Sequence, residues 1–145
     1  MYSTIDICSI SMESSKYILY ADDDKDDLDI FEEAFKQFTS YSLMTFRNGI
    51  DLLAFIDLKA ISHNIHLIIS DINMPFLNGI ETLRLLKSNG HSKNIPVCLY
   101  STSANAMDKI IAETMNTKIF VKPFTLSAIK EVTESMLLEC HEPIG

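Results

Sequence analysis

The stretch LYADDDKDDLD, residues 19–29, carries five aspartates within the six positions from 22 to 27. It continues an apolar run at 17–21 that has the composition of a buried strand. Carboxylates held this close repel one another, and their pKa values rise unless a cation neutralises them. Mg²⁺ prefers oxygen ligands and keeps several of its waters, so two carboxylates and a backbone carbonyl are enough to bind it. The stretch therefore predicts a divalent cation site at the end of a strand.

Other residues with suitable chemistry also stand directly after apolar runs. They are Asp71 and Asn73 after 65–70, Ser101, Thr102 and Ser103 after 95–100, and Lys122 after 118–121. An aspartate beside a metal ion can attack a phosphoryl group and form an aspartyl phosphate. The metal and a lysine then offset the charge of the phosphoryl oxygens, and a hydroxyl can donate a hydrogen bond to one of them. Together these residue types indicate phosphoryl chemistry on an aspartate.

Apolar runs of strand length alternate with helix-length segments along the chain. The pattern predicts strands at 16–21, 41–46, 65–70, 95–100 and 118–121, a first helix with its apolar face between 28 and 38, and further helices at 50–60, 80–88, 104–115 and 126–139. Such alternation is typical of α/β domains, in which helices cover both faces of a parallel sheet. Ligands bind at the carboxyl ends of the strands in open sheets of this kind. We therefore expect the acidic stretch, Asp71, the hydroxyl cluster and Lys122 to meet at one edge of the sheet.

The composition limits the class of protein. The chain has 145 residues, of which 47% are hydrophobic, enough for one domain with its own core. Its formal net charge of -8 makes direct binding to nucleic acid electrostatically unfavourable. Its apolar stretches fall short of the roughly 20 residues that span a bilayer, so we expect no membrane segment. Cys8, Cys98 and Cys140 are an odd and widely spaced set, which favours reduced thiols and a cytoplasmic location.

Four segments of the chain together resemble the receiver domain of two-component response regulators. They are ILYADDDKDD, LIISDINMPFLNG, IPVCLYSTSA and FVKPF, and they stand in the order found in that family. The resemblance covers about residues 16–139 and implies a flavodoxin-like fold, a doubly wound five-stranded parallel sheet with strand order 2-1-3-4-5 flanked by five helices. We therefore expect a receiver domain at 16–140, preceded by a flexible serine-rich arm at 1–15.

The resemblance also implies a phosphoacceptor and a set of metal ligands. Asp71 matches the phosphoacceptor. Asp23 matches a direct metal ligand, Asp22 a ligand through water, and the backbone carbonyl of Asn73 a further ligand. Together with Asp71 itself, these residues are implied to bind Mg²⁺ or Mn²⁺.

Other positions match the family's residues for binding and releasing the phosphoryl group. Those implied to bind it are Ser101, Thr102 and Lys122, and the peptide bond from Lys122 to Pro123 is implied to be cis. Asn73 and Ser103 are expected to tune dephosphorylation, because their spacing from Asp71 and Ser101 sets them beside the phosphoryl group. Ile119 departs from the family, which usually carries there a Tyr or Phe that moves inward on activation.

A receiver domain implies a sensor histidine kinase or a histidine phosphotransfer protein as the phosphoryl donor. Phosphorylation is then expected to bias a two-state surface near the fourth helix, fifth strand and fifth helix, which a downstream protein reads. Because little chain follows the last predicted helix, we expect output through protein–protein contact or phosphate relay. We expect slow self-dephosphorylation at most, and no enzymatic turnover.

The residues leave alternatives open. Asp26, Asp27 and Asp29 fall in the first turns of the predicted helix, where carboxylates favour the positive end of the helix dipole, so we interpret them as capping and solvated residues. A phosphatase of haloacid-dehalogenase-like type would use the same nucleophile, metal, hydroxyl and lysine, but it needs a general-acid aspartate where this chain has Asn73. A receiver that binds partners without phosphorylation is a third candidate, which Ile119 keeps in consideration.

Overall fold

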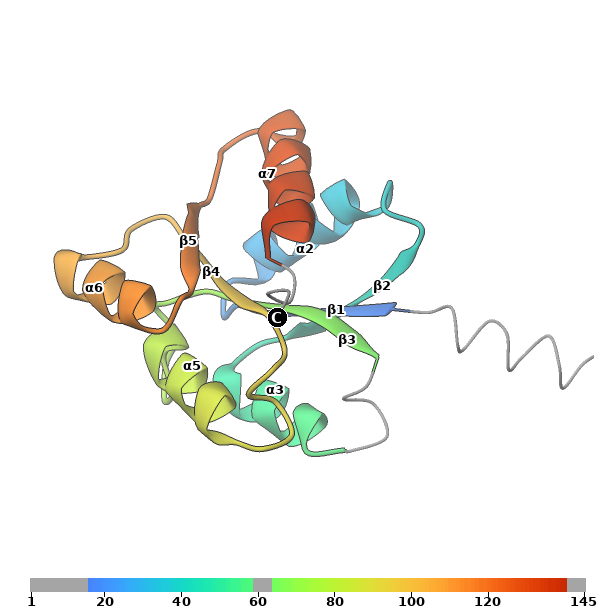
Figure 1. The fold of residues 1–145 in the computed structure, drawn as a ribbon. Helices are drawn as coiled ribbons and strands as arrows, with labels where there is room; N and C mark the ends of the chain where they lie inside the picture. The colour runs from blue at the N-terminus through green and yellow to red at the C-terminus, as the bar shows by residue number, and fades with distance from the viewer. Residues whose placement is uncertain (1–15, 59–63, 141–145) are drawn as a thin grey trace, which may run out of the picture.

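The computed structural model describes residues 16–58 and 64–140, and Figure 1 shows their arrangement. The stretch 1–15, for which we predict a flexible arm, lies outside the described residues. The strands are β1 (Lys16–Ala21), β2 (Tyr41–Phe46), β3 (Ile65–Ser70), β4 (Val97–Ser101) and β5 (Lys118–Val121). They form a parallel sheet in the order β2-β1-β3-β4-β5. The predicted α/β fold with strand order 2-1-3-4-5 is therefore confirmed.

Helices cover both faces of this sheet. They are α2 (Lys25–Phe35), α3 (Gly49–Ile56), α5 (Gly79–Ser88), α6 (Ala106–Thr114) and α7 (Leu126–Glu139). Helices α2 and α7 lie on one face, α3 and α5 lie on the other, and α6 lies beside β5 (Figure 1). Each helix follows a side chain that accepts a hydrogen bond from the backbone of its first turn, and these caps are Asp24, Asn48, Asn78, Asn105 and Thr125. The caps explain where the helices begin.

Strand β4 starts later in the chain than the apolar run predicts. Pro96 has no N–H to donate to a neighbouring strand, although its carbonyl accepts a hydrogen bond from the N–H of Ile68 at 2.9 Å. At the other end, Ser101 still pairs with Val121 of β5. The strand therefore runs from Val97 to Ser101, and the expected span of 95–100 is shifted toward the carboxyl end.

Successive residues of β1 face opposite sides of the sheet and enter separate cores. Tyr20 packs on the side of α2, where its ring centroid lies 4.6 Å from that of Phe31. Leu19 packs on the other side with Leu52 of α3 and Leu83 of α5. All of these side chains are fully buried. Because burying one such side chain contributes about 1.5–3 kcal/mol, both helical layers are anchored to the sheet and its strand ends are held in place.

The register of the sheet brings the carboxyl ends of β1, β3, β4 and β5 to the same edge. Ala21 of β1 pairs with Ser70 of β3, and the N–H of Asp71 donates to the carbonyl of Ala21 at 2.9 Å. Between β5 and β4, the N–H of Lys122 donates to the carbonyl of Ser101 at 3.0 Å. The polar residues that follow these strands therefore share one edge of the sheet, as expected.

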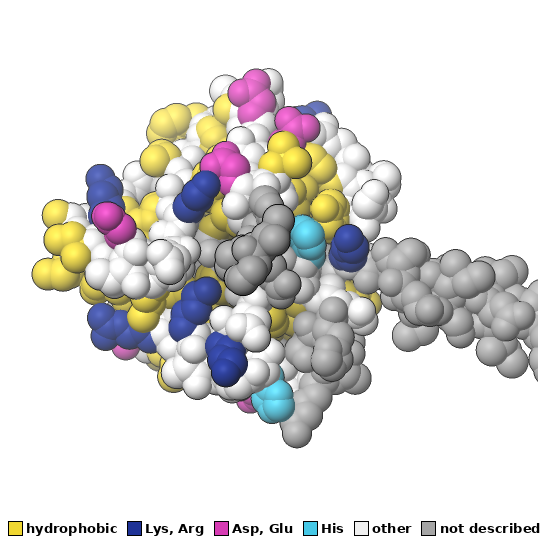
Figure 2. Space-filling model, viewed as in Figure 1, with side chains coloured by type: hydrophobic (Ala, Val, Ile, Leu, Met, Phe, Trp, Pro, Cys, Tyr) yellow, Lys and Arg dark blue, Asp and Glu magenta, His cyan; other side chains and the backbone are white. Residues whose placement is uncertain are grey.

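Two features of the surface bear on possible partners. None of the helices in the two described segments is long and apolar enough to cross a membrane. On the face seen in Figure 2, the Lys and Arg side chains are scattered among acidic and polar ones and form no continuous basic surface. That face therefore lacks the positive surface with which proteins contact a nucleic-acid backbone.

Gly79, the first residue of α5, packs against the backbone of the strand end that carries Asp71. A Cβ at Gly79 would lie 2.1 Å from the carbonyl oxygen of Asp71 and 2.8 Å from the Cα of Ile72. We expect Gly79→Ala to lower the free energy of unfolding by about 1–3 kcal/mol in urea denaturation, because backbone atoms must shift to make room. Gly90→Ala is the control, since a Cβ at Gly90 meets nothing within 4 Å. Equal stability of the two variants would contradict the close approach.

Candidate functional site

Asp22 follows β1 directly and its carboxylate is surrounded by protein donors. Its Oδ2 accepts hydrogen bonds from the hydroxyl of Tyr20 at 2.5 Å and from Nζ of Lys122 at 2.6 Å. Its Oδ1 accepts one from the N–H of Asp24 at 3.0 Å. Asp22 is fully buried, and a buried charge is costly unless such donors replace the water that it loses. The protein itself therefore fixes the orientation of this carboxylate.

Asp71 follows β3, and its side chain is 9% exposed. Its Oδ1 accepts a hydrogen bond from the N–H of Ile72 at 2.8 Å and lies 3.6 Å from Nζ of Lys122. Burial, together with the charge of Asp22, raises the pKa of Asp71 to about 6, although Lys122 and the N–H of Ile72 act in the opposite direction. Lys122 and the N–H of Ile72 therefore do not fully compensate the negative charge of the Asp71 carboxylate.

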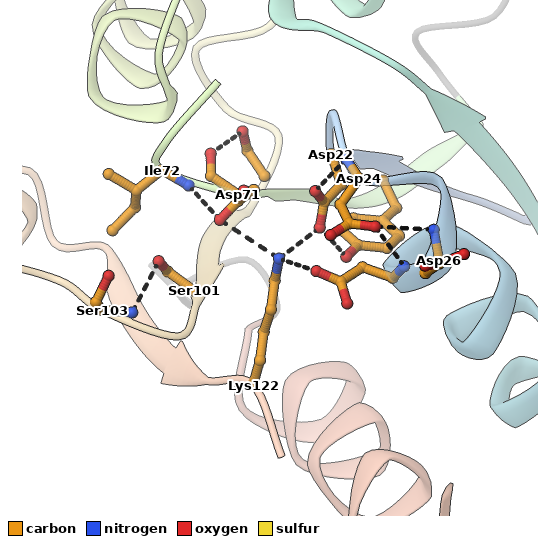
Figure 3. Close-up of polar contacts among 11 residues, drawn as sticks. Asp22, Asp24, Asp26, Asp71, Ile72, Ser101, Ser103 and Lys122 are labelled. Atoms are coloured by element: carbon orange, nitrogen blue, oxygen red, sulfur yellow. Dashed lines mark hydrogen bonds and ion pairs between the residues drawn. The ribbon is translucent and has the colours of Figure 1, made fainter. Parts of the chain in front are cut away.

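Lys122 follows β5 and lies between these acidic side chains, as Figure 3 shows. Its Nζ donates to Oδ2 of Asp22 at 2.6 Å and to Oδ2 of Asp27 at 2.8 Å. Both distances are shorter than the 3.6 Å from Nζ to Oδ1 of Asp71. It also lies 5.8 Å from the centre of the Tyr100 ring, a cation–π contact. Burial lowers the pKa of Lys122, but the hydrogen bonds to Asp22 and Asp27 outweigh burial, so the pKa is raised above its usual value. Lys122 therefore stays charged throughout the physiological range.

Carboxylate oxygens of Asp22, Asp23 and Asp71 lie within 4.8 Å of one another. A single divalent ion can bridge oxygens at this spacing, and a set of oxygen donors suits Mg²⁺ or Mn²⁺. Asn73, whose carbonyl we expect as a further ligand, is exposed in the loop after Asp71. The residues present therefore fit a divalent cation, which would add positive charge that Lys122 alone does not supply.

The hydroxyl cluster, Ser101, Thr102 and Ser103, begins at the last residue of β4 and lies at the same edge of the sheet. Ser101 is buried, and its Oγ accepts a hydrogen bond from the N–H of Ser103 at 3.3 Å (Figure 3). Thr102 and Ser103 are exposed in the loop that leads to α6. Beside this loop a cavity of about 660 Å³ opens between α6 and β5, and Ile119 is one of the residues that line it. Ile119 therefore borders open space next to Ser101.

The peptide bond between Lys122 and Pro123 differs from the expected one. The described residues contain no cis peptide bond, so this bond is trans, and the expected cis bond is not found. The trans form before a proline is intrinsically favoured, by about 0.5–1 kcal/mol. A preference this small is decided by tertiary surroundings, which a short sequence motif does not specify.

Asp27 belongs to the site, although its position near the start of α2 predicts capping alone. Its N–H does donate to Oδ1 of Asp24 at 3.3 Å, but its own carboxylate pairs with Lys122 at 2.8 Å. The capping interpretation is therefore incomplete for Asp27, whereas Asp29 pairs with Lys25 at the surface. A sequence signal exists, because Asp27 stands four residues before the buried Phe31 and so on the inward face of the helix.

Tyr20 is a second residue that the sequence pattern does not single out. Its side chain is fully buried, and its hydroxyl donates to Asp22. The signal for it was also present, because residues two apart on a strand face the same side and a buried tyrosine hydroxyl needs a partner. Burial, with the adjacent charge of Asp22, raises the pKa of Tyr20 well above its usual range, so the phenol remains a donor.

The family model of the response regulator receiver domain matches residues 18–134. The chain therefore belongs to the receiver domain family of two-component response regulators, and the resemblance drawn from the four motifs is confirmed. Receiver domains are signalling modules that bind a divalent metal ion. Those of the CheY type interact with histidine kinases and with downstream proteins.

Individual relatives agree with this assignment. The response regulator Rcp1 of Synechocystis sp. is 31% identical over 110 residues, which are 73% of this chain and 75% of Rcp1. The chemotaxis protein CheV2 of Helicobacter pylori is 25% identical over 130 residues, which are 90% of this chain but only 41% of CheV2. The similarity to CheV2 is therefore confined to a part of that longer protein.

Solved structures with the same fold include two response regulators of this kind. The crystal structure of the phosphorylated cyanobacterial phytochrome response regulator RcpA has a TM-score of 0.75 and 27% identity, covering 90% of this chain and 99% of RcpA. The Mn²⁺-bound form of Rcp1 has a TM-score of 0.75 and 26% identity, covering 89% of this chain and 99% of Rcp1. The fold is therefore shared over nearly all of the described chain.

We expect Asp71→Asn to stabilise the metal-free protein at neutral pH. The pKa of Asp71 is about 6 in the fold against an ordinary value of 3.8, so the folded protein holds this proton more tightly than the unfolded chain does. The contribution of Asp71 to stability therefore falls as the pH rises from about 4 to about 6 and stays low above that. Removing the charge should raise the free energy of unfolding at pH 7 by on the order of 2 kcal/mol.

The measurement is urea denaturation in the presence of EDTA, repeated with Mg²⁺. Added Mg²⁺ should stabilise the wild-type protein more than Asp71→Asn, because the variant has lost a charged ligand. If Asp71→Asn were less stable than the wild type at pH 7 in EDTA, the negative charge of Asp71 would have to be fully balanced by its protein partners, and the expectation would be wrong.

Proposed function

We propose that Asp71 is the phosphoacceptor of this receiver domain. A carboxylate oxygen of Asp71 attacks the phosphorus of a phosphohistidine, so that an O–P bond forms, the N–P bond breaks and its electron pair returns to the imidazole nitrogen. The proposal rests on the convergence of charges at Asp71, whose carboxylate lies 3.6 Å from Lys122 and within 4.8 Å of oxygens from Asp22 and Asp23. A nucleophile, a cation and a metal-binding set of oxygens meet at that carboxylate.

Asp22, Asp23, Asp71 and the backbone carbonyl of Asn73 are proposed to hold Mg²⁺ or Mn²⁺. Bound there, the ion would offset the negative charge of the phosphoryl oxygens. Asp22 already accepts hydrogen bonds from Tyr20 and Lys122, which supports a contribution through water. Asp23 has no such engagement of its carboxylate among the described contacts, which supports direct ligation. The Mn²⁺-bound form of Rcp1 supports a divalent ion in a receiver of this type.

Lys122 and the hydroxyl cluster are proposed to bind the phosphoryl group once Asp71 carries it. The ammonium of Lys122 pairs with one phosphoryl oxygen. The hydroxyl of Ser101, with Thr102 beside it, donates to another, because Oγ of Ser101 accepts from the N–H of Ser103 and keeps its own proton for donation. Asn73 and Ser103, both exposed, are proposed to control the approach of water and hence the rate of dephosphorylation.

A downstream protein is proposed to read the phosphorylated state at the surface of α6, β5 and α7. Movement of the Ser101 loop toward the phosphoryl group would change the cavity of about 660 Å³ beside it. Ile119 lines this cavity, so an aliphatic side chain can repack there without the ring that the family usually carries. Met107 and Val121 are 61% and 69% exposed in this region and offer apolar contact to a partner.

The proposed phosphoryl donor is a sensor histidine kinase or a histidine phosphotransfer protein in the cytoplasm. The phosphorylated form of RcpA supports phosphorylation of a receiver of this type. The odd and widely spaced set of three cysteines in the sequence supports a reducing compartment. Asn73 has no acidic proton to give to a leaving group, so we propose slow self-dephosphorylation at most and no turnover as a phosphatase.

Acetyl phosphate and Mg²⁺ should add a single phosphoryl group to the wild-type protein, measured by intact-mass spectrometry. Asp71→Asn should gain none, because the variant has no carboxylate at this position, and EDTA should prevent the gain on the wild type. Asp57→Asn is the matched control, since Asp57 is an exposed aspartate at the end of α3. No added mass on the wild type, or an equal gain on Asp71→Asn, would reject the proposed function.

A further inference from the structure

Lys122 is held on one side by a carboxylate that belongs neither to the phosphoacceptor nor to the metal ligands. Its Nζ lies 2.8 Å from Oδ2 of Asp27 and 2.6 Å from Oδ2 of Asp22, but 3.6 Å from Asp71. The last distance is too long for a hydrogen bond. In the unmodified protein, the lysine is therefore bonded to Asp22 and Asp27 instead of Asp71.

The position of Asp27 is set by the helix that carries it. Asp24 caps α2, and its Oδ1 accepts hydrogen bonds from the N–H groups of Asp26 and Asp27. One turn further on, the fully buried Phe31 anchors the same face of α2 in the core. Asp27 is thus presented to Lys122 by a helix, whereas Lys122 itself follows directly on β5.

The two carboxylates that bind Lys122 differ in how easily they can release the lysine. Asp22 is fully buried, so without Lys122 its negative charge would have no water around it. The side chain of Asp27 is 37% exposed, so water can solvate it when the lysine leaves. A phosphoryl group on Asp71 would bring new anionic oxygens toward Nζ, and the ammonium has three protons to share among its acceptors. Asp27 is therefore the partner that gives way.

We propose that Asp27 is a positioning residue that competes with the phosphoryl group for Lys122. In the unmodified protein it holds the ammonium by a hydrogen bond and leaves it at ion-pair distance, 3.6 Å, from Asp71, and it yields the ammonium when Asp71 is phosphorylated. Asp27 therefore disfavours the phosphorylated state. This inference rests on the proposed function of Asp71 and adds to it a residue that tunes the equilibrium.

The test compares Asp27→Asn with the wild type in binding fluoroberyllate, a stable mimic of the phosphoryl group. The titration is run at saturating Mg²⁺, so that a change in metal affinity does not contribute, and it is followed by amide NMR spectra. Asp27→Asn should bind fluoroberyllate more tightly by up to about fivefold, the upper limit expected for losing one partly exposed ion pair.

Asp26→Asn and Asp27→Glu are the matched controls. Asp26→Asn removes the same charge from the neighbouring exposed residue, which makes no bond to Lys122, and should bind fluoroberyllate as the wild type does. Asp27→Glu keeps the carboxylate and should restore wild-type affinity. Thermal unfolding of each variant verifies that the fold is retained.

The ¹⁵N resonance of Nζ of Lys122, assigned with Lys122→Arg, gives a readout that a purely structural role would not change. Fluoroberyllate should shift this resonance in the wild type, and free Asp27→Asn should already be displaced toward the bound position. Equal fluoroberyllate affinities for Asp27→Asn and Asp26→Asn, or weaker binding by Asp27→Asn, would overturn the inference while leaving the proposed function intact. Failure of the wild type itself to bind fluoroberyllate with Mg²⁺ would instead reject the proposed function.

Discussion

The site depends on one ammonium group placed among more negative charge than it can balance. Nζ of Lys122 bonds to Asp22 and Asp27 and leaves Asp71 at 3.6 Å, so the carboxylate that is proposed to react receives less from the lysine than these two do. The pKa of Asp71 is raised to about 6 because burial and the charge of Asp22 disfavour its ionised form more than Lys122 favours it. A divalent ion and a phosphoryl group both change this balance, the first by adding positive charge and the second by drawing the lysine away from Asp27. Metal binding, phosphorylation and the state of the lysine are thus linked through one set of charges.

Backbone hydrogen bonds between the strands position the residues that carry the side chains of the site. Pairing of Ala21 with Ser70, and the hydrogen bond from the N–H of Lys122 to the carbonyl of Ser101, align strands that are far apart in the sequence. Helix α5 then closes against the end of β3, where Gly79 leaves no room for a Cβ beside the carbonyl of Asp71. Cores on both sides of the sheet hold these strand ends rigid. Charges that repel can be kept close because the energy for doing so comes from burial elsewhere in the domain.

Much of this could be predicted from the sequence, because apolar periodicity fixes strands and parallel strands share a carboxyl edge. The predicted strands agree with the structure except at β4, where the missing N–H of Pro96 delays the start. The sequence also predicted a site formed by Asp22, Asp23, Asp71 and Lys122, and the structure brings these residues together. The sequence did not identify Asp27 as a partner of Lys122, because which side chain meets Lys122 depends on how α2 packs on the sheet. It also did not identify Tyr20 as a donor to Asp22, although alternation along β1 places both residues on one side of the sheet. The predicted cis isomer of the bond before Pro123 was wrong for a related reason. The intrinsic preference between cis and trans is small, so the tertiary surroundings of the bond decide the isomer.

The most direct measurement is the titration of the Asp71 carboxyl group, followed by ¹³C NMR in the metal-free protein and in Lys122→Met. We expect an apparent pKa of about 6 for Asp71 in the wild type, and a higher pKa in the variant, because the lysine is the main cation that lowers it. An ordinary pKa near 4 in the wild type, or a pKa that Lys122→Met leaves unchanged, would contradict the proposed charge balance between Lys122 and Asp71.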